Sequence, residues 1–471
     1  MSLSCFIIEN ALIPSADAYA PATVKTTGTH IADINQDIST EGVRVDATDK
    51  FLLPGFVNAH THSSELWCRG YIPPLPLELW LAELYDFDVL EPEHIYLSAL
   101  GTAVETLLSG GTTVVDHLVP IPGKEIESIA AAERAYREIG IRAFIGPLLQ
   151  DEPMTAGIPS GNGSTHLSIE PQHTQGVLDI LAEAVQKFHR PHDGISIMAA
   201  PTGAQLCSDA FFEGCIDLSD RHHLCRHTHL LESKAQKMLA HEKYGCTAVE
   251  HLKHLNFLGD RTSLAHSIWL EENDIQMLAQ TKSTVVHNPL SNLRLGSGIA
   301  PLLRYRQAGV NVTFGCDGAA SNDSQDLLEA IKIGTLLHNT TDFDYRRWIT
   351  PQKAVQMASQ GGATGLGMGD RLGSIDVGKL ADLVLYDLKS MSLLPRTDPI
   401  GLLVMGRPTQ AVDRVWVNGR QVVEHGQVTT IDVDALKQEL YDRSQWKRAT
   451  EQSPSRVAIE ARYRSVMRLP L

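Results

Sequence analysis

The stretch PGFVNAHTHSSE, residues 54–65, places two histidines, His60 and His62, at the end of an apolar run. Residues two apart on a strand face the same side of it, so both imidazoles are directed at one point. Imidazole nitrogen is a common metal ligand in proteins. The stretch therefore predicts a strand that ends in a metal site. The chain has 20 histidines, so chance spacing is the alternative, and the rest of the sequence has to decide.

Apolar, β-branched segments like this one recur along the chain. Several lack strict alternation, which is typical of strands buried on both faces. Helix-like stretches separate them, and glycine or a polar cluster ends many of these stretches. The eight segments are residues 56–62, 112–118, 142–149, 195–203, 224–232, 262–269, 283–289 and 310–318. Strands alternating with helices in this way predict an α/β fold, specifically a (β/α)8 TIM-type barrel.

The two ends of the chain have a different pattern. Residues 1–57 and 372–430 read as short strands and turns, and we expect them to build one small β-sandwich domain together. Residues 58–371 would form the metal-dependent barrel. Residues 431–471 are charged and helical, which predicts a surface helix or an oligomer contact.

The composition argues against several partners. Of 471 residues, 43% are apolar and 20% charged, and the formal net charge is −16. Such a surface repels phosphate backbones, so we expect no nucleic-acid partner. The chain also lacks the H-x-E…P-C-x-x-C signature of nucleic-acid deaminases. No apolar run approaches membrane-spanning length, so no membrane association is expected.

Cysteine usage indicates a reducing compartment. The seven cysteines include no C-x-x-C, which predicts neither a disulfide framework nor a zinc ribbon. The first 20 residues lack a basic region followed by a long apolar one, so they do not resemble a signal peptide. We therefore expect a cytoplasmic protein.

Several polar side chains fall at the ends of the predicted strands. In barrels of this type the active site lies at the C-terminal ends of the strands. The residues at these ends are His60 and His62, His229 and Glu232, His266, His287, and Asp317. Their convergence on one rim favours a catalytic site over a set of unrelated structural histidines.

These residue types suit one divalent metal. Zn²⁺ takes imidazole nitrogen and carboxylate oxygen, and a catalytic zinc keeps a position open for water. His60, His62 and His229 would supply three neutral ligands, and Asp317 an anionic oxygen. Such a metal lowers the pKa of its water from 15.7 to roughly 7. Fe²⁺ is the alternative, because ligand type alone does not select strictly.

The remaining rim residues have separable expected roles. Asp317 can be both weak ligand and base. Glu232, three residues past His229, can reach over the substrate as a proton shuttle to the leaving group. His266 can polarise the attacked centre or stabilise the developing negative charge. His117 ends the second predicted strand, and a place behind the metal ligands and a purely structural role stay equally open.

The motifs together resemble the amidohydrolase superfamily. The similarity runs from about residue 50 to residue 390 and is greatest to the aminohydrolase branch, which holds S-adenosylhomocysteine/methylthioadenosine deaminases, guanine deaminase-like enzymes and chlorotriazine hydrolases. The motifs that carry it are PGFVNAHTH, HTHLLE, AHSIWL, HNPLSNLRLGSGIAP and FGCDGAASND. The resemblance also implies a homodimer or larger homo-oligomer.

The resemblance implies specific roles. The metal ligands would be His60, His62, His229 and Asp317, with Glu232 as the proton shuttle to ring nitrogen and leaving amine, and His266 beside the attacking hydroxide. His287, with Asn288 and Asn292, resembles the seventh-strand signature and would form the pocket wall or lie behind it. Some metal barrels of this type bridge two metals through a lysine after strand four, but AAPTGAQLCS holds no lysine there, which favours a single metal.

Two departures bear on the substrate. Adenosine-type deaminases commonly have a histidine after the proline that ends strand four, where this chain has Pro201 followed by Thr202, and an arginine after strand three, where it has Pro147. Both differences argue against a substrate as large as a nucleoside. Gln205 could offer an amide pair to a flat ring. Trp80, like Trp67, could stack on such a ring or simply pack its loop.

The sequence therefore predicts metal-dependent hydrolytic deamination of a small N-heterocycle of purine, pterin, pyrimidine or triazine type, with release of ammonia. One alternative is a hydrolase of the same fold that displaces chloride or an alkylamine, or opens a cyclic amide. The other is a non-catalytic barrel that serves as an assembly protein.

Overall fold

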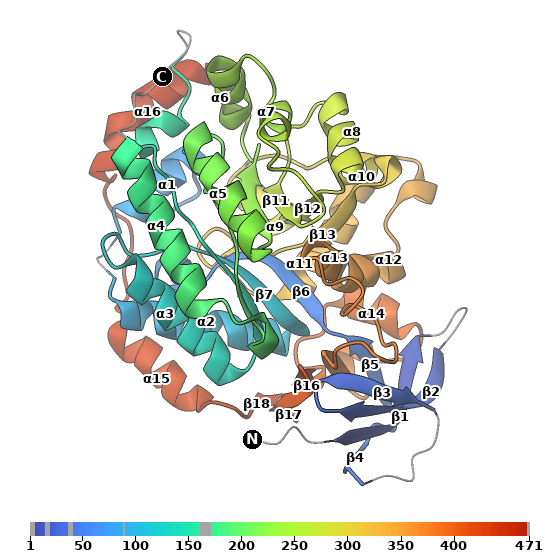
Figure 1. Cartoon of the computed structure of the whole chain (residues 1–471). Coiled ribbons are helices and arrows are strands. Elements are labelled where there is room, and N and C mark those ends of the chain that lie inside the picture. Colours follow the sequence, from blue (N-terminus) through green and yellow to red (C-terminus); the bar gives the residue numbers. More distant parts are fainter. Residues whose placement is uncertain (1–4, 15–18, 36–40, 88–89, 161–170, 469–471) are drawn as a thin grey trace.

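The computed structural model describes residues 5–14, 19–35, 41–87, 90–160 and 171–468 (Figure 1). Its parallel strands are β6 (Phe56–His62), β7 (Gly111–Leu118), β8 (Arg142–Pro147), β9 (Ile195–Ile197), β10 (Arg226–Leu230), β11 (Thr262–His266), β12 (Thr284–His287), β13 (Asn311–Phe314) and β14 (Asp317–Gly318). Each of the eight predicted segments contains a strand, and the last is divided into β13 and β14.

The parallel strands pair in chain order. One sheet has the order β14-β6-β7-β8-β9 and the other the order β10-β11-β12-β13. Parallel bridges from Ala199 to Arg226 and from Gly203 to His229 connect the chain after β9 with β10. Between β13 and β14, Gly315 passes so close to His60 that an added Cβ would lie 2.9 Å from the His60 Cβ. Glycine therefore permits the approach that brings Asp317 beside the first strand.

Helices lie around these strands, and most of them connect one strand to the next (Figure 1). They are α1 (Leu77–Tyr85), α2 (Pro92–Leu108), α3 (Glu125–Ile139), α4 (Pro171–Phe188), α5 (Asp209–His222), α6 (Lys234–Tyr244), α7 (Ala248–His254), α8 (Glu272–Thr281), α9 (Pro289–Arg294), α10 (Leu302–Ala308), α11 (Leu327–Leu336), α12 (Pro351–Gln356), α13 (Gly362–Gly365) and α14 (Pro399–Gly406). Local chemistry sets their ends. The Ser208 side chain accepts from Phe211 N at 3.1 Å at the start of α5, and Gly140 ends α3 at a φ of 86°.

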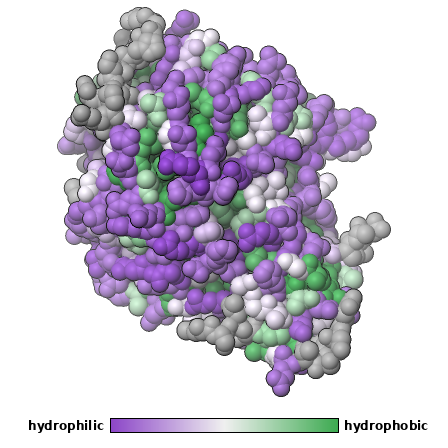
Figure 2. All heavy atoms as spheres, in the orientation of Figure 1, coloured by the Kyte–Doolittle hydropathy of each residue, from purple (hydrophilic) through white to green (hydrophobic). Residues whose placement is uncertain are grey.

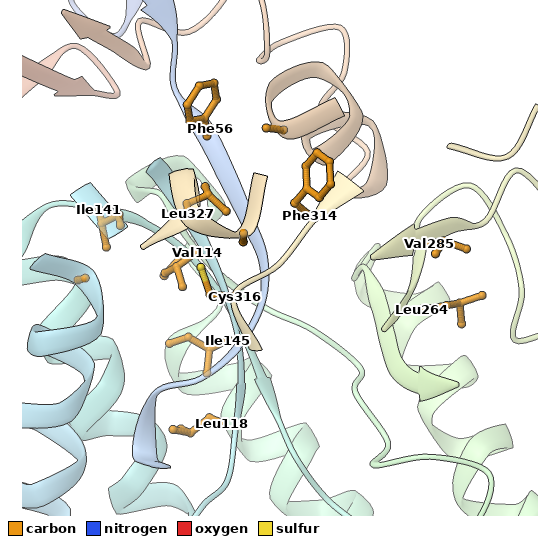
Figure 3. Packing of buried hydrophobic residues seen from close by; sticks show 14 of the residues in the cluster. Phe56, Val114, Leu118, Ile141, Ile145, Leu264, Val285, Phe314, Cys316 and Leu327 are labelled. Atoms are coloured by element: carbon orange, nitrogen blue, oxygen red, sulfur yellow. The ribbon is translucent and has the colours of Figure 1, made fainter. Parts of the chain in front are cut away.

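The parallel strands are buried on both faces. Phe56, Val114, Ile145, Leu264 and Val285 belong to the large core cluster, where their side chains are fully buried (Figure 3). Burying such a side chain contributes about 1.5–3 kcal/mol. The other face of the same strands forms a second buried cluster, which includes Val57, Val115, Phe144, Met198 and Val286. This two-sided burial explains why the sequence shows no strict alternation.

Strands from both ends of the chain form a separate, nine-stranded sheet in the order β18-β17-β16-β15-β5-β1-β2-β3, with β4 paired to β1 (Figure 1). Its strands are β1 (Phe6–Pro14), β2 (Tyr19–Thr27), β3 (His30–Ile34), β4 (Val43–Asp46), β5 (Lys50–Pro54), β15 (Leu383–Asp387), β16 (Val412–Val417), β17 (Arg420–Glu424) and β18 (Gln427–Val428). The expected sandwich is thus one continuously paired sheet in the described residues, because β5 and β15 join the two ends of the chain antiparallel.

The C-terminal segment forms two helices, α15 (Val433–Arg443) and α16 (Pro454–Val466). Helix α16 lies beside α1, as Figure 1 shows at the C-terminal end of the chain. The face of the molecule in Figure 2 is mainly hydrophilic, in keeping with the charged composition. Across the described ranges, none of the helices combines the length and apolarity needed to cross a membrane.

Candidate active site

Three imidazoles converge at the C-terminal ends of β6 and β10. One ring nitrogen each of His60, His62 and His229 lies within 4.8 Å of the other two. The Nε2 atoms of His62 and His229 are 3.2 Å apart. Asp317 Oδ1 lies 3.4 Å from His60 Nε2 and 3.5 Å from His62 Nε2. Four side chains from three separate strands thus face one small volume.

Backbone carbonyls fix how two of these rings are protonated. His62 Nδ1 donates to the carbonyl oxygen of His117 at 2.6 Å, and His229 Nδ1 donates to that of Thr202 at 2.7 Å. A carbonyl oxygen can only accept, so Nδ1 carries the hydrogen in both rings. The Nε2 lone pairs of His62 and His229 are therefore free and point toward each other.

A side-chain relay fixes the third ring. His60 Nδ1 lies 2.8 Å from His227 Nε2, and His227 Nδ1 lies 2.7 Å from Ser263 Oγ. Ser263 Oγ in turn donates to the carbonyl oxygen of Arg226 at 3.4 Å. With the hydroxyl hydrogen used there, Ser263 accepts from His227, and His227 accepts from His60. The His60 Nε2 atom is left as a buried acceptor with no hydrogen-bond partner among the described residues.

This arrangement fits a cation. Three imidazole nitrogens and one carboxylate oxygen face the same volume, and two ring nitrogens 3.2 Å apart repel unless a positive charge lies between them. Burial and the neighbouring histidines lower the pKa of His229 to about 3, so this ring is neutral, as a ligand must be. A second nearby trio, His60, His117 and His227, is unsuitable because His227 uses both ring nitrogens in hydrogen bonds.

Two carboxyl groups flank His266 beside this cluster. His266 Nε2 lies 3.5 Å from Glu232 Oε2 and 3.7 Å from Asp317 Oδ2. Asn292 Oδ1 accepts from His266 Nδ1 at 2.9 Å, which turns Nε2 toward the two carboxyls. Burial, together with the charge of Asp317, raises the pKa of Glu232 well above its ordinary value. Glu232 is therefore suited to hold a proton that Asp317 does not hold.

The backbone is strained where these side chains leave their strands. His266 has a φ of 67°, Ser267 one of 52° and Asp317 one of 66°, all in the left-handed region. Non-glycine residues adopt this region at a cost of about 1–3 kcal/mol, and they gather at functional sites. Hydrogen bonds hold the turn after β11, where Ser267 N donates to the carbonyl oxygen of Leu230 at 2.8 Å.

A cavity opens above the cluster. Its walls include the metal-facing His62 and His229, the acidic Glu232 and Asp317, and His266. Helix α1 supplies an apolar wall that includes Leu77, Trp80, Leu81 and Leu84, while Gln205 and Gln236 lie among the polar lining residues. A flat, partly apolar molecule with a few polar atoms suits such walls.

Comparison with known proteins assigns the chain to a family. The Amidohydrolase family model matches residues 51–422. The chain is also 30% identical over 444 residues to a 5-methylthioadenosine/S-adenosylhomocysteine deaminase of Caldanaerobacter subterraneus subsp. tengcongensis, covering 93% of this chain and 95% of that protein. The chain belongs to the amidohydrolase family. The resemblance inferred from the motifs is thereby confirmed.

Solved structures similar to this amidohydrolase include two that hold zinc. An atrazine chlorohydrolase from Arthrobacter aurescens TC1, complexed with zinc, has a TM-score of 0.84 and 25% identity, covering 93% of this chain and 99% of that one. An adenosine deaminase from Xanthomonas campestris with bound zinc has a TM-score of 0.81 and 26% identity, covering 93% and 97%.

The other residues predicted from the sequence fall in different places in this amidohydrolase. Trp80 and Gln205 line the cavity, and Asn292 orients His266. The His117 ring lies against His229, with centroids 4.8 Å apart, and its Nε2 donates to a backbone carbonyl. His287 does not line the cavity; its Nε2 lies 3.2 Å from Nε2 of His338, which follows helix α11.

Sequence reasoning missed three polar side chains here. Gln236 Oε1 accepts from Glu232 N at 2.8 Å and so fixes the turn that carries this carboxyl. Ser297 Oγ donates to Glu232 Oε1 at 3.4 Å. Glu65 lines the cavity, and burial raises the pKa of its carboxyl to about 7. Glu65 ends the quoted stretch 54–65, and its place three residues after His62 is the one signal that could have found it.

Proposed function

We propose that this amidohydrolase removes an amino group by hydrolysis from a small N-heterocycle and releases ammonia. The observation that carries the proposal is the pair of carboxyls, Glu232 and Asp317, that flank His266 at the edge of the imidazole cluster. One carboxyl holds a proton and the other does not, which is the arrangement that general acid–base catalysis requires. The deaminase relatives support the same reaction type.

We infer that the parallel strands close into a single (β/α)8 barrel with the site at its C-terminal rim. The pairing of β14 with β6 and the bridges between the chain after β9 and β10 support closure. The boundaries we propose are 58–371 for the barrel, 1–57 plus 372–430 for the β-domain, and 431–471 for the helical segment.

The resident metal of the proposal is one Zn²⁺, held by His60, His62, His229 and Asp317. His62 Nε2 and His229 Nε2, 3.2 Å apart, are close enough that both would bind the same ion. The zinc in two similar solved structures supports this choice over Fe²⁺. When bound, such a metal supplies a water of lowered pKa for attack on carbon.

The side chains of the protein carry the protons. Glu232, with its raised pKa, gives a proton to the ring nitrogen of the substrate, so that the neighbouring carbon becomes electrophilic. Asp317 accepts a proton from the attacking water, and His266 Nε2, 3.7 Å from Asp317 Oδ2, lies beside the carboxyl that takes this proton. Asp317 then returns the proton to the exocyclic nitrogen. Ammonia leaves, the hydrogen that remains on the added hydroxyl passes to Glu232 and restores its carboxyl, and a carbonyl group remains on the ring.

A second candidate is displacement of chloride or an alkylamine by the same machinery. The similarity to an atrazine chlorohydrolase favours it, since both reactions add water to an electrophilic ring carbon. The presence of Asp317 next to Glu232 favours release of ammonia over release of chloride. An amino group is a poor leaving group and needs the proton that Asp317 returns to its nitrogen. The size of the substrate is a separate question. The names of the deaminase relatives favour a nucleoside substrate. Pro147 and Thr202 stand where adenosine-type deaminases have an arginine and a histidine, and this difference favours a smaller heterocycle.

The deciding experiment is an ammonia-release screen over purines, pterins, pyrimidines, triazines and nucleosides, with metal analysis of the same sample. Ammonia release by protein that holds about one metal per chain supports the proposal. Release of chloride, an alkylamine or a ring-opened acid in place of ammonia would establish the second candidate. Protein purified without chelator that holds no metal would favour a non-catalytic assembly role.

We also propose a cytoplasmic location and a homodimer or larger homo-oligomer. All seven cysteines are free, which suits a reducing compartment. The oligomer follows from the resemblance to the aminohydrolase branch. Light scattering on the purified protein and fractionation of cells test the two points separately.

A further inference from the structure

Glu65 is the acidic residue in the cavity for which the reaction has no use. It lies in the short 3-10 helix Ser63–Cys68, directly after the strand that ends in His62, and is 5% exposed. Its carboxyl lines the same cavity as Glu232 and Asp317. Neither holding the metal nor moving the protons described above requires a third carboxyl. The Glu65 carboxyl is therefore available for another role, such as binding the substrate.

The chain makes room for this carboxyl. A Cβ added at Gly318 would lie 1.8 Å from Glu65 Oε2 and 2.5 Å from its Cδ, so the carboxyl rests directly on the glycine that follows Asp317. Ala320 N donates to the same Oε2 at 3.3 Å. The glycine and this amide hold the carboxyl at a fixed place in the cavity wall.

The carboxyl is poorly compensated within the protein. Among the described residues, Ala320 N donates a hydrogen bond to Glu65 Oε2. No lysine or arginine of these residues forms an ion pair with Glu65. Burying a carboxylate without such partners is costly, so a ligand that donates a hydrogen bond to this carboxyl would lower that cost. The Oε1 atom accepts no hydrogen bond from these residues and is left for a ligand.

The charges around the cavity limit what that ligand can be. Its lining contains Glu65, Glu232 and Asp317 but no lysine or arginine among the described residues. The charge of the proposed cation is already partly offset by Asp317, so a phosphate or carboxylate group placed beside Glu65 would meet a like charge with no lysine or arginine to compensate it. A neutral or cationic ring that presents N–H groups would instead supply the missing donors.

We propose that Glu65 is a specificity-determining residue whose Oε1 accepts an N–H group of the substrate, so that the site selects amino-substituted or N–H-bearing heterocycles and rejects anionic ones. This inference rests on the proposed deamination and adds the substrate class. While Ala320 N occupies Oε2, Oε1 accepts a ring N–H or a second amino group, one that is not released. Glu232 acts at the ring nitrogen beside the reacting carbon.

The test compares matched ligands on the metal-loaded protein. For the ring type that the wild type deaminates fastest, kcat and KM are measured for two compounds that differ in one N–H group away from the reacting carbon, for example 2,6-diaminopurine and adenine if that ring is a purine. The variant is Glu65→Gln, which keeps size and shape but turns an N–H₂ group toward the ligand when its oxygen accepts from Ala320. The control is Glu91→Gln, at an exposed glutamate.

We expect Glu65→Gln to raise KM about 10- to 100-fold for the compound with the additional N–H group, the range for losing a charged hydrogen bond. KM for its partner, kcat for both and the metal content should stay within about threefold of the wild type, and Glu91→Gln should change nothing. An equal effect on both compounds, or none, would overturn the role of Glu65 while leaving the deaminase proposal intact. A wild type that releases ammonia from no heterocycle would instead overturn the proposed function itself. Loss of metal from Glu65→Gln would show a structural role and also count against the inference.

Discussion

Arg142 and Asp382 form a buried ion pair between the first residue of β8 and the residue that precedes β15. Arg142 Nε donates to Asp382 Oδ2 at 3.1 Å, and Arg142 Nη2 donates to Oδ1 at 2.9 Å. The two side chains are 3% and 2% exposed. Asn418 N donates to the same carboxylate at 2.8 Å. This pair therefore ties the parallel strands to the terminal sheet.

Asp382→Asn should destabilise the fold, because it leaves the Arg142 guanidinium buried without its counter-charge. Removing one partner of a buried pair typically costs about 3–5 kcal/mol. Chemical denaturation of the two proteins at neutral pH measures the difference. The control is Asp434→Asn, which removes an exposed partner of Lys437 and should cost below about 1 kcal/mol. Equal losses in the two variants would show that the buried pair does not hold the two parts together.

Glu232→Gln should lower kcat for ammonia release by about 10²–10⁴, the usual contribution of a general acid–base group. The amide cannot give up a proton, yet it keeps the size of the side chain and can still accept from Ser297. Metal content and thermal midpoint should therefore match those of the wild type. Near-normal ammonia release by this variant would remove Glu232 from the mechanism.

Much of the site could be predicted because strand ends dictate it. His60, His62, His229 and Asp317 each follow a recognisable apolar run, and parallel strands bring such ends to one edge. Glu65 could not be placed in the same way, since the chain has left the strand by then and turns into a 3-10 helix that faces the cavity. Its position depends on Gly318, which lies far away in sequence.

The terminal sheet shows a different limit. The sequence indicates short strands at both ends, but the strand order depends on long-range pairing such as Leu383 with Pro54. Nothing local in either segment specifies this partner. His287 likewise ends a predicted strand, yet its ring meets His338, and only tertiary packing decides which way a ring at a strand end is turned.

Chelation of the metal should abolish ammonia release and lower the thermal midpoint. The free nitrogens of His60, His62 and His229 would again face one another without a cation. A ligand that binds only the folded state stabilises it, by an amount that grows with the logarithm of the free ligand concentration relative to its Kd. Differential scanning calorimetry before and after dialysis against a chelator measures the shift, and added Zn²⁺ should restore both properties. An unchanged midpoint together with retained activity would contradict the proposed site.

Arg456→Ala should raise KM with little change in kcat. Arg456 Nη1 lies 3.3 Å from Glu83 Oε1, and through this contact α16 holds α1, which carries the cavity-lining Trp80. Ser455 reinforces the contact with hydrogen bonds of 2.9 and 2.8 Å to Asp86. Loosening the wall weakens substrate binding but leaves the proton-transfer groups in place.

Steady-state kinetics on the best substrate of the screen would show this effect as a rise in KM of several-fold. Arg448→Ala, at an exposed position between α15 and α16, is the matched control and should behave like the wild type. A loss confined to kcat, or the same KM in both variants, would mean that α16 does not position the wall.

The pairing of β5 with β15 can form only late in the synthesis of the chain. Lys50–Pro54 leaves the ribosome early, whereas its antiparallel neighbour Leu383–Asp387 emerges only after all the parallel strands have been made. Closing so long a loop is slow, and an unpaired strand edge invites aggregation in the meantime. Nascent chains stalled before residue 383 should therefore bind chaperones that full-length chains have already released.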